Sequence, residues 1–377
     1  MAQYYTSVEI SDLLVKQLGS LSPSNILDIG CGDSNLLVAA GARWKKANLF
    51  GIDIDPVNIS KTHNKLTLLS GDGFDPNLYH KIIETCGEID LSVSNPPYLS
   101  IDYTKKEKHI LSLAGFDKII GQNIRFIPSE LVFLAQNLRV MKPNAELAII
   151  LPAGLISGVK WQTFRDFILN EFDIQACIQL PQNAFKKTEA STFALILKKA
   201  PAQNKKIKIS NINSSIKYDI SREDAIKRMD YQYYSQPYYN VHLGLSSADD
   251  IEIFRGNLSN KQLRESGLDY IHTQDLSIGF NEISRNNQIE SSPMKYAVKG
   301  DILIARVGTR CIGRVSYLKK GKLPISDCVF VIRTKNSNAL WNSIKSSQLT
   351  DFLKFSALGV GAKYITIEML KEIFNEK

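Results

Sequence analysis

Ile26-Leu27-Asp28-Ile29-Gly30-Cys31-Gly32-Asp33-Ser34-Asn35 is the stretch of this chain that decides the fold. It begins as a short apolar strand, turns at Gly30 and Gly32, and leads into a helix. Glycines let the backbone approach a ligand closely, and the first turn of a helix presents unpaired N–H groups to it. The third glycine of a dinucleotide fingerprint is absent, because Ser34 and Asn35 follow Gly32. The stretch therefore predicts an α/β protein with a nucleotide-cofactor loop and disfavours NAD.

Two more predicted strands end in polar residues. The apolar run 49–52 ends in Asp53, a position from which a carboxylate takes both hydroxyls of a ribose. The run 66–69 ends in Gly71-Asp72-Gly73-Phe74, which offers a carboxylate for an adenine amino group and an aromatic ring for the base. A doubly wound parallel sheet gathers such strand ends at one crevice. We therefore expect a Rossmann-like sheet with a cofactor site at one edge.

Asn95-Pro96-Pro97-Tyr98 follows a fourth apolar run, residues 89–93. The side-chain oxygen of Asn95 and the backbone carbonyl of Pro96 can together accept two hydrogen bonds from one exocyclic amino group. Proline has no backbone N–H, so Pro96 offers no competing donor. Tyr98 adds a flat face for a planar base. Such acceptors raise the reactivity of an adenine amino group, which is a poor nucleophile because its lone pair is delocalised. The tetrapeptide predicts a catalytic loop for an extruded base; the alternative is that two prolines merely end a strand.

The order of these motifs resembles the gamma class of S-adenosylmethionine-dependent N6-adenine DNA methyltransferases over about the first 200 residues. Residues 3–7 look like that family's N-terminal Tyr-x-Thr-Pro element, although Ser7 stands where proline is usual. Residues 28–35 are similar to the glycine loop of type I modification subunits. The resemblance implies S-adenosyl-L-methionine as cofactor, bound by these residues: Tyr5, Thr6, Asp28, Gly30, Gly32, Asp53, Asp72 and Phe74.

Later segments extend the resemblance. Residues 130–134, 141–143 and 147–152 match the helix and strand that follow the catalytic loop in the family. Residues 185–192 look like the motif whose aromatic side chain stacks on the flipped base. The resemblance thus implies that Phe185 and Tyr98 hold the base between them.

Charge is distributed unevenly along the 377 residues, which carry a net charge of +8 and are 44% hydrophobic. Residues 1–200 contain 20 basic and 20 acidic side chains, whereas residues 201–377 contain 26 and 18. Phosphate neutralisation supplies most sequence-independent affinity for DNA. The second half is therefore predicted to bind double-stranded DNA, with a merely soluble basic surface as the alternative.

Cysteine and histidine usage argues against a metal or disulfide framework. The five cysteines contain no C-x-x-C pair, and the five histidines are scattered. None of the cysteines lies in the Pro-Cys loop that cytosine C5 methylation needs. The chain shows no secretory signal, and its longest apolar run is interrupted by Pro152. We expect a cytoplasmic protein with no metal and no membrane contact.

Three segments are predicted: a methyltransferase domain at 1–200, a connector at 201–224, and an α+β target-recognition domain at 225–377. Residues 299–309, 312–315 and 359–366 are similar to type I specificity subunits, and the first two are predicted as strands separated by turns. A helix is expected over 367–374. Candidate DNA contacts are Arg306, Arg310 and Arg314, although solvated charge explains any one arginine equally well.

One recognition domain predicts either a monomer that reads a short site or a protein completed by a restriction or specificity subunit. The sequence therefore predicts a site-specific adenine-N6 DNA methyltransferase of a restriction-modification or defence system. Two alternatives stay open. One is a cofactor-binding DNA-recognition subunit without catalysis. The other is methylation of RNA guanine N2 or of a protein glutamine, since those reactions pose the same hydrogen-bonding problem for an Asn-Pro-Pro-Tyr loop.

Overall fold

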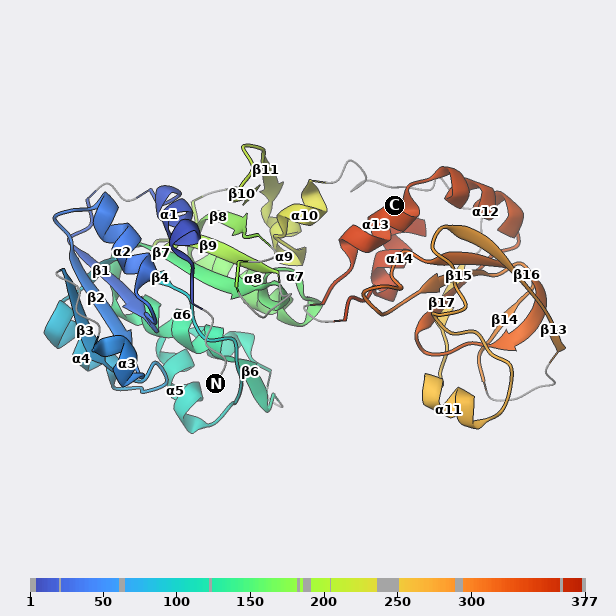
Figure 1. The fold of residues 1–377 in the computed structure, drawn as a ribbon, viewed down its shortest axis with the longest axis horizontal. Coiled ribbons are helices and arrows are strands. Elements are labelled where there is room, and N and C mark those ends of the chain that lie inside the picture. Colours follow the sequence, from blue (N-terminus) through green and yellow to red (C-terminus); the bar gives the residue numbers. More distant parts are fainter. Residues whose placement is uncertain are drawn as a thin grey trace. The chain divides into compact units, whose positions relative to one another are not determined.

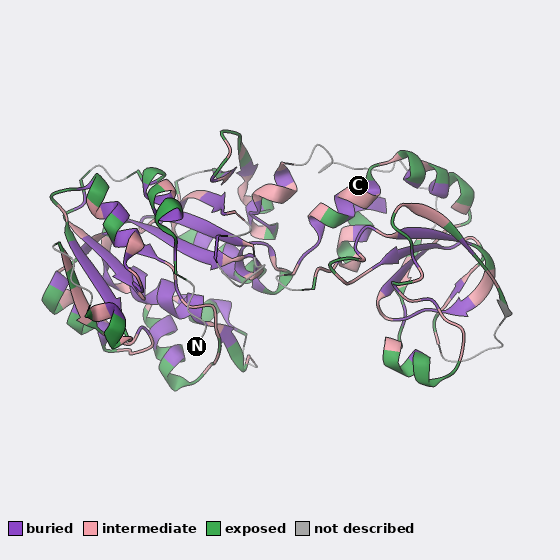
Figure 2. Cartoon of the chain, viewed as in Figure 1, coloured by how far each residue is buried: buried purple, intermediate pink, exposed green. Residues whose placement is uncertain are grey.

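The computed structural model describes residues 5–19, 22–60, 65–121, 124–181, 184–185, 191–203, 205–235, 251–288, 294–359 and 362–374. The chain forms two compact units, Met1–Tyr231 and Gln232–Lys377. Each unit has its own sheet and its own buried core (Figures 1 and 2).

The first unit is built on a nine-stranded sheet with the order β11-β10-β8-β9-β7-β4-β1-β2-β3. Strands β3, β2, β1, β4 and β7 are parallel, and β9 runs antiparallel between β7 and β8. The sheet strands are β1 Asn25–Ile29, β2 Asn48–Asp53, β3 Leu66–Ser70, β4 Ile89–Ser94, β7 Met141–Pro152, β8 Asp173–Gln179, β9 Thr192–Lys198, β10 Lys206–Asn211 and β11 Lys217–Ser221. A small hairpin adds β5 Ser100–Asp102 and β6 Phe126–Pro128.

Helices lie on both faces of this sheet, as Figure 1 shows for α1 and α2 on one side and α5 and α6 on the other. The helices of the first unit are α1 Val8–Lys16, α2 Asn35–Arg43, α3 Pro56–Ile59, α4 Leu78–Cys86, α5 Lys105–Leu113, α6 Ser129–Val140, α7 Ala153–Ser157, α8 Gln162–Glu171 and α9 Arg222–Lys227; α10 Tyr231–Tyr234 spans the unit boundary. The strand order reverses between β1 and β4, so the loops after these strands open a crevice at the carboxyl edge. The predicted doubly wound fold is thus confirmed.

The predicted connector, residues 201–224, contains β10 and β11 of this sheet. Strand β10 pairs with β8, and its residues Ile207 and Ile209 are buried while Lys206 and Lys208 are exposed. This apolar–polar alternation is the period of a half-buried strand, and it marks the segment as part of the sheet. With the boundary at Tyr231, the first unit carries 27 basic and 24 acidic residues and the second 19 and 14. The excess positive charge is therefore shared between the units.

Arg165 fastens the last helix of the first unit to its core. This arginine on α8 is fully buried, and its guanidinium donates hydrogen bonds at 2.6–3.0 Å to four backbone carbonyls, those of Leu155, Gly158, Ile226 and Lys227. Because two of these carbonyls lie at the end of α9, Arg165 ties the chain beyond residue 225 to the rest of the first unit.

The second unit has a six-stranded sheet in the order β12-β17-β15-β16-β13, with β14 paired to β16. Its strands are β12 Glu252–Arg255, β13 Phe280–Gln288, β14 Tyr296–Val298, β15 Ile302–Ala305, β16 Val315–Pro324 and β17 Val329–Arg333. Its helices are α11 Asn260–Glu265, α12 Ser337–Ser346, α13 Leu349–Ser356 and α14 Ile367–Phe374. The last three helices contribute to one core around Trp341 and Phe352. The predicted α+β class and the predicted helix over 367–374 agree with this architecture.

One predicted strand of the second unit is a turn. Residues 308–314 form successive tight turns, in which the N–H groups of Cys311 and Ile312 both donate to the carbonyl of Gly308. Gly308 has φ +111° and Gly313 φ +85°, values that side chains disfavour. Strand β16 therefore begins only at Val315.

We predict that Arg165→Met lowers the free energy of unfolding of the first unit by about 3 kcal/mol or more, because four buried carbonyls lose their donor. Urea unfolding in a Trp341→Phe background, followed by the fluorescence of Trp44 and Trp161, reports on this unit alone. Arg125→Met is the matched control, since the Arg125 side chain is 81% exposed. Equal stability of the two variants would contradict the assigned role of Arg165.

Candidate cofactor and base site

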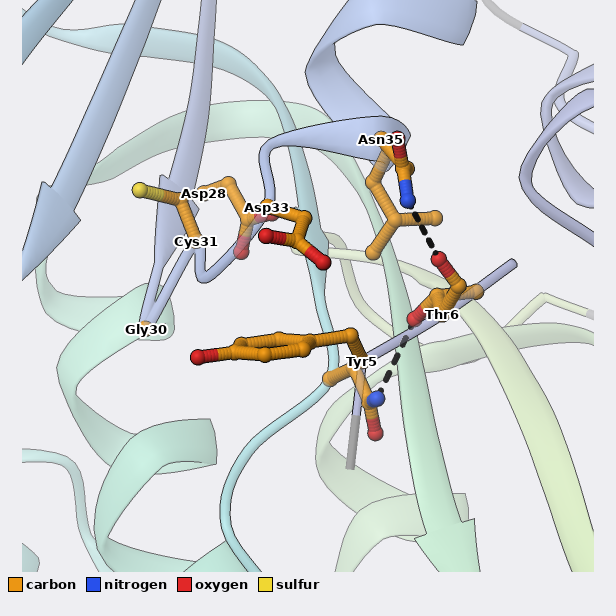
Figure 3. A pocket seen from close by; sticks show the side chains of 9 residues that line it. Tyr5, Thr6, Asp28, Gly30, Cys31, Asp33 and Asn35 are labelled. Atoms are coloured by element: carbon orange, nitrogen blue, oxygen red, sulfur yellow. Dashed lines mark hydrogen bonds between the residues drawn. The ribbon is translucent and has the colours of Figure 1, made fainter. Parts of the chain in front are cut away.

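A pocket lies at the carboxyl edge of the first sheet, where β1 and β4 end (Figure 3). It is lined by Tyr5, Thr6, Asp28, Gly30, Cys31, Asp33, Asn35, Leu36 and Asn95. Four of the predicted cofactor residues thus share one pocket with the predicted catalytic asparagine. Cys31, Asp33, Asn35 and Leu36 were not predicted as site residues, although the first three belong to the stretch 26–35 that predicted the cofactor loop.

The glycine loop adopts a conformation that needs glycine. Gly30 has φ +81° and Gly32 φ +51°, and a Cβ atom on Gly32 would lie 2.5 Å from the Tyr5 ring. The N–H of Gly32 donates to the Asp53 carboxylate at 2.8 Å, and the other oxygen of Asp53 accepts from the N–H of Asp55. Asp53, predicted as the ribose ligand, is 8% exposed and also fastens the loop to the end of β2.

Asp28 is the pocket's buried, unpartnered acceptor. It is 2% exposed, and its Oδ1 accepts no hydrogen bond from any residue that the structure describes. Burial, with a smaller contribution from the nearby Asp53 carboxylate, raises the pKa of Asp28 well above its usual range. A cationic donor placed at this oxygen would favour the ionised carboxylate and remove the cost of burying an unpaired polar atom.

The N-terminal segment crosses the pocket. Thr6 is 6% exposed, and its carbonyl accepts from Asn35 Nδ2 at 2.8 Å, as Figure 3 shows. Its Oγ1 accepts from Asn95 Nδ2 at 3.1 Å. Ser7 caps α1 by accepting from the N–H of Ile10. Its φ of −67° is the value that proline would impose. Ser7, which stands where proline is usual in the resembled element, therefore keeps the same backbone conformation and adds a helix cap. Residues 3 and 4 of the predicted element lie outside the described residues.

The predicted catalytic loop, residues 95–98, is held by hydrogen bonds on both sides. The Tyr98 hydroxyl donates to Asn95 Oδ1 at 3.1 Å. Ser129, the first residue of α6, donates through Oγ to the Pro97 carbonyl and accepts from the N–H of Leu99 at 3.0 Å. The Pro96 carbonyl accepts no hydrogen bond within the described part of the chain. The loop is therefore preorganised while the Pro96 carbonyl is free to accept a hydrogen bond from a base.

Tyr98 and Phe185 do not form a sandwich in this structure. Their ring centroids are 6.2 Å apart with an interplanar angle of 89°, and Phe185 is 2% exposed within the apolar core. To hold a base between them, two parallel rings have to lie apart by roughly twice the spacing of about 3.4 Å that separates stacked nucleic-acid bases. With no base present, the two rings adopt the edge-to-face contact that aromatic quadrupoles favour. Residues 186–190 of the predicted motif lie outside the described residues.

Asp72 and Phe74 lie after β3 and do not line the pocket. Asp72 accepts from the N–H of Phe74, and the Phe74 ring packs edge-on against Phe133 with centroids 5.4 Å apart. Phe133 on α6 was not predicted to matter. A Cβ atom on Gly30 or Gly73 would lie 3.2 or 2.4 Å from its ring, so Phe133 joins the loops after β1 and β3.

The three predicted DNA-binding arginines separate into different roles. Arg306 Nε donates to the Asp327 carbonyl, and Arg314 donates to the carbonyls of Thr273 and Leu276. Both guanidinium groups therefore hold loops of the second unit together. Arg310, on the turn before β16, is exposed. It is the one of the three that is available to a phosphate.

Cys31 lines the pocket with a buried thiol. Burial and the neighbouring Asp28 raise the pKa of Cys31 to about 12, so its thiol stays protonated near neutral pH. Among the described residues, no three His, Cys, Asp or Glu side chains gather as metal ligands would. The described helices also include none long and apolar enough to cross a membrane.

Comparisons with known proteins agree with this architecture. A family model described as N-6 DNA Methylase matches residues 1–271. The type II methyltransferase M.CvrRI of Paramecium bursaria Chlorella virus XZ-6E is 22% identical over 200 residues, which cover 52% of this chain and 48% of that protein. The methylase subunit of the type I restriction enzyme MpnII of Mycoplasma pneumoniae is 26% identical over 219 residues, covering 52% and 40%. The chain spans about half the length of the curated relatives it matches.

A solved structure resembles both units. The crystal structure of the type IIG restriction endonuclease BpuSI aligns with a TM-score of 0.53 at 13% identity, covering 100% of this chain and 59% of that one. At this identity the likeness shows a shared fold.

Glu130 provides a test of the electrostatics behind the catalytic loop. It is 3% exposed, and burial raises its pKa to about 7, while a hydrogen bond from Ser129 acts in the opposite direction. The folded protein therefore keeps this proton up to about pH 7, whereas the unfolded chain releases it near the ordinary value of 4.5. Stability should fall as pH rises through this window, by on the order of 3 kcal/mol from this group.

We predict that Glu130→Gln removes this contribution, so that the variant gains stability relative to wild type as pH rises from 4.5 to 7. Urea unfolding of the first unit at several pH values, again with Trp341→Phe, measures the difference. Glu84→Gln, at an exposed position on α4, is the control and should keep the wild-type pH profile. Parallel pH profiles for wild type and Glu130→Gln would show that Glu130 ionises normally.

Proposed function

Because the chain belongs to the N-6 DNA Methylase family, we propose that it transfers a methyl group from S-adenosylmethionine to N6 of adenine in double-stranded DNA. The observation that carries the proposal is the placement of Asn95, whose carboxamide lines the same pocket as the glycine loop. A methyl donor on that loop and an amino group on that carboxamide would then meet in one pocket. Sequence-specific recognition of the DNA and a role in restriction-modification are part of the proposal.

The pocket's donor set fits the cofactor. S-adenosylmethionine carries an ammonium group, and Asp28 offers a buried oxygen that lacks a donor among the described residues. Gly30 and Gly32 give the backbone room to approach a ligand, and Asp53 lies at the end of β2 for a ribose. Tyr5, Thr6 and Asn35 would close the pocket from the N-terminal side. When bound, the cofactor supplies an electrophilic methyl group on a positively charged sulfur.

Asn95 and Pro96 would orient the adenine amino group. Two acceptors that bond both amino hydrogens favour tetrahedral geometry at N6 and free its lone pair for attack on the methyl carbon. In the transfer the methyl–sulfur bond would break as the bond between the amino nitrogen and the methyl carbon forms, the sulfur would keep the electron pair, and one amino proton would then leave to water. Ser129 supports this geometry by holding the Pro97 carbonyl and the Leu99 N–H. Positioning by a preorganised loop is the main catalytic contribution.

Tyr98 and Phe185 would stack on the extruded base, for which the edge-to-face pair has to open. Tyr98 stays a neutral hydroxyl, because burial and the nearby Glu130 carboxylate raise its pKa well above the usual range. Base–aromatic stacking is worth roughly 1–3 kcal/mol per base, which helps offset the cost of unstacking.

The second unit would bind the DNA duplex and select the site. Its charge of 19 basic and 14 acidic residues suits a phosphate-contacting module, and the exposed Arg310 lies on a turn rather than in a core. A partner subunit would supply cleavage in a restriction system. The cytoplasm is the compartment in which such an enzyme would meet DNA.

We predict that Asn95→Ala lowers the rate of methyl transfer to DNA by two to three orders of magnitude, since one preorganised hydrogen bond to the reacting group typically contributes on the order of 3–4 kcal/mol. Single-turnover transfer of labelled methyl groups measures the rate, and calorimetry should find S-adenosylmethionine affinity within a few-fold of wild type.

Asn213→Ala is the control for this substitution, because Asn213 is exposed on the turn between β10 and β11. It should keep the wild-type rate. An Asn95→Ala enzyme that methylates DNA at the wild-type rate would refute the assigned mechanism, and wild-type protein that binds the cofactor without methylating any DNA would refute the proposed activity.

We also predict that Arg310→Ala weakens DNA binding and reduces the slope of log affinity against log salt by about one, as expected for the loss of one phosphate contact. Fluorescence anisotropy at several salt concentrations measures the slope. Lys371→Ala, at an exposed position on α14, is the matched control. An unchanged slope for Arg310→Ala would remove this residue from the DNA interface.

A further inference from the structure

The side-chain amide of Asn95 could face the base with either of its two ends, and the proposed reaction needs one of them. The oxygen and nitrogen ends of a carboxamide have nearly the same shape, but only the oxygen can accept from an adenine amino group. A 180° rotation about the last side-chain bond would present a donor to a donor. The carboxamide therefore needs a fixed position in the pocket, with its oxygen toward the base.

Thr6 contacts the nitrogen end. Its Oγ1 accepts from Asn95 Nδ2 at 3.1 Å, while the oxygen end, Oδ1, receives the Tyr98 hydroxyl at 3.1 Å. Thr6 is 6% exposed, so water competes little for this hydrogen bond. As a β-branched residue, threonine is also restricted at χ1, which keeps the hydroxyl in place.

The position of Thr6 is in turn set by elements outside the catalytic loop. Its carbonyl accepts from Asn35 Nδ2 at 2.8 Å, and Asn35 is the first residue of α2, directly after the glycine loop. On the other side, Ser7 caps α1, and the carbonyl of Ser7 accepts from the N–H and the hydroxyl of Ser11. Helices α1 and α2 both contribute to the apolar core of the first unit. Thr6 is thus fixed to the glycine-loop side of the pocket, and its hydroxyl reaches the catalytic loop through the hydrogen bond with Asn95.

We propose that Thr6 is a positioning residue: its hydroxyl bonds one end of the Asn95 carboxamide while Tyr98 bonds the other, so that Thr6 holds the carboxamide in place and links it to the glycine loop through Asn35. This inference rests on the proposed methyl transfer and adds a role for Thr6 beyond contact with the cofactor. Thr6 acts on the reaction through Asn95, so its effect should disappear when Asn95 is absent.

The test is a double-mutant cycle of Thr6→Val and Asn95→Ala at saturating S-adenosylmethionine. Valine keeps the shape and removes the oxygen. Thr6→Val alone should lower kcat about tenfold, the effect of one hydrogen bond, and Thr6→Ser should recover most of the loss. In the Asn95→Ala background, Thr6→Val should cause no further loss. Thr85→Val, the same change at an exposed position on α4, should leave kcat unchanged.

A second readout needs no catalysis. In protein labelled with ¹⁵N-asparagine, the Asn95 side-chain NH₂ signal should exchange slowly with water in wild type and Thr6→Ser, and quickly in Thr6→Val. Equal losses from Thr6→Val with and without Asn95, together with an unchanged NH₂ signal, would overturn the inference and leave the proposed function intact. Wild-type protein without any methyl transfer to DNA would instead overturn the proposed function, and the NH₂ signal would then decide the positioning role alone.

Discussion

Parallel pairing of β1 with β4 is the constraint on which the rest of the first unit depends. Ile26 lies opposite Leu91 and Leu27 opposite Ser92, so the two strands end at one edge of the sheet. Asp28 and Asn95 reach the same pocket for that reason. The Ser92 and Ser94 hydroxyls donate to backbone carbonyls of β1, which adds side-chain hydrogen bonds to the ladder. Cofactor chemistry and base chemistry can then share a site although their residues lie far apart in the sequence.

Hydrogen bonds join the loops that this pairing brings together. Asp53 fastens the glycine loop to β2, Ser129 fastens the catalytic loop to α6, and Thr6 connects the two loops. Each of these side chains is almost fully buried, so each bond is little weakened by water. Asp28 is equally buried, but its Oδ1 accepts no hydrogen bond from the described residues. A buried acceptor that lacks a donor is suited to a cationic ligand.

The sequence predicted those parts of the structure that depend on local pattern. Short apolar runs and glycine turns located β1, β2, β3 and β4 and the loops after them, because strand periodicity and positive φ angles are local properties. Phe133 and Ser129 were missed because their roles arise only when α6 packs beneath Gly30 and Gly73 and beside Pro97. The edge-on contact of Phe185 with Tyr98 and the structural roles of Arg306 and Arg314 likewise depend on tertiary neighbours. For β10 the alternation of polar and apolar residues was present in Lys206-Ile207-Lys208-Ile209, but the polar residues before it led to the prediction of a connector.

The central claim is that this pocket methylates adenine at a defined DNA site. Its most direct measurement is methylation-sensitive sequencing of DNA from cells that express the chain, compared with cells that express Asn95→Ala. The account predicts N6-methyladenine at one sequence motif in the first sample and none at that motif in the second. Methyl groups found in RNA or on a protein glutamine, with no modified adenine in the DNA, would contradict it.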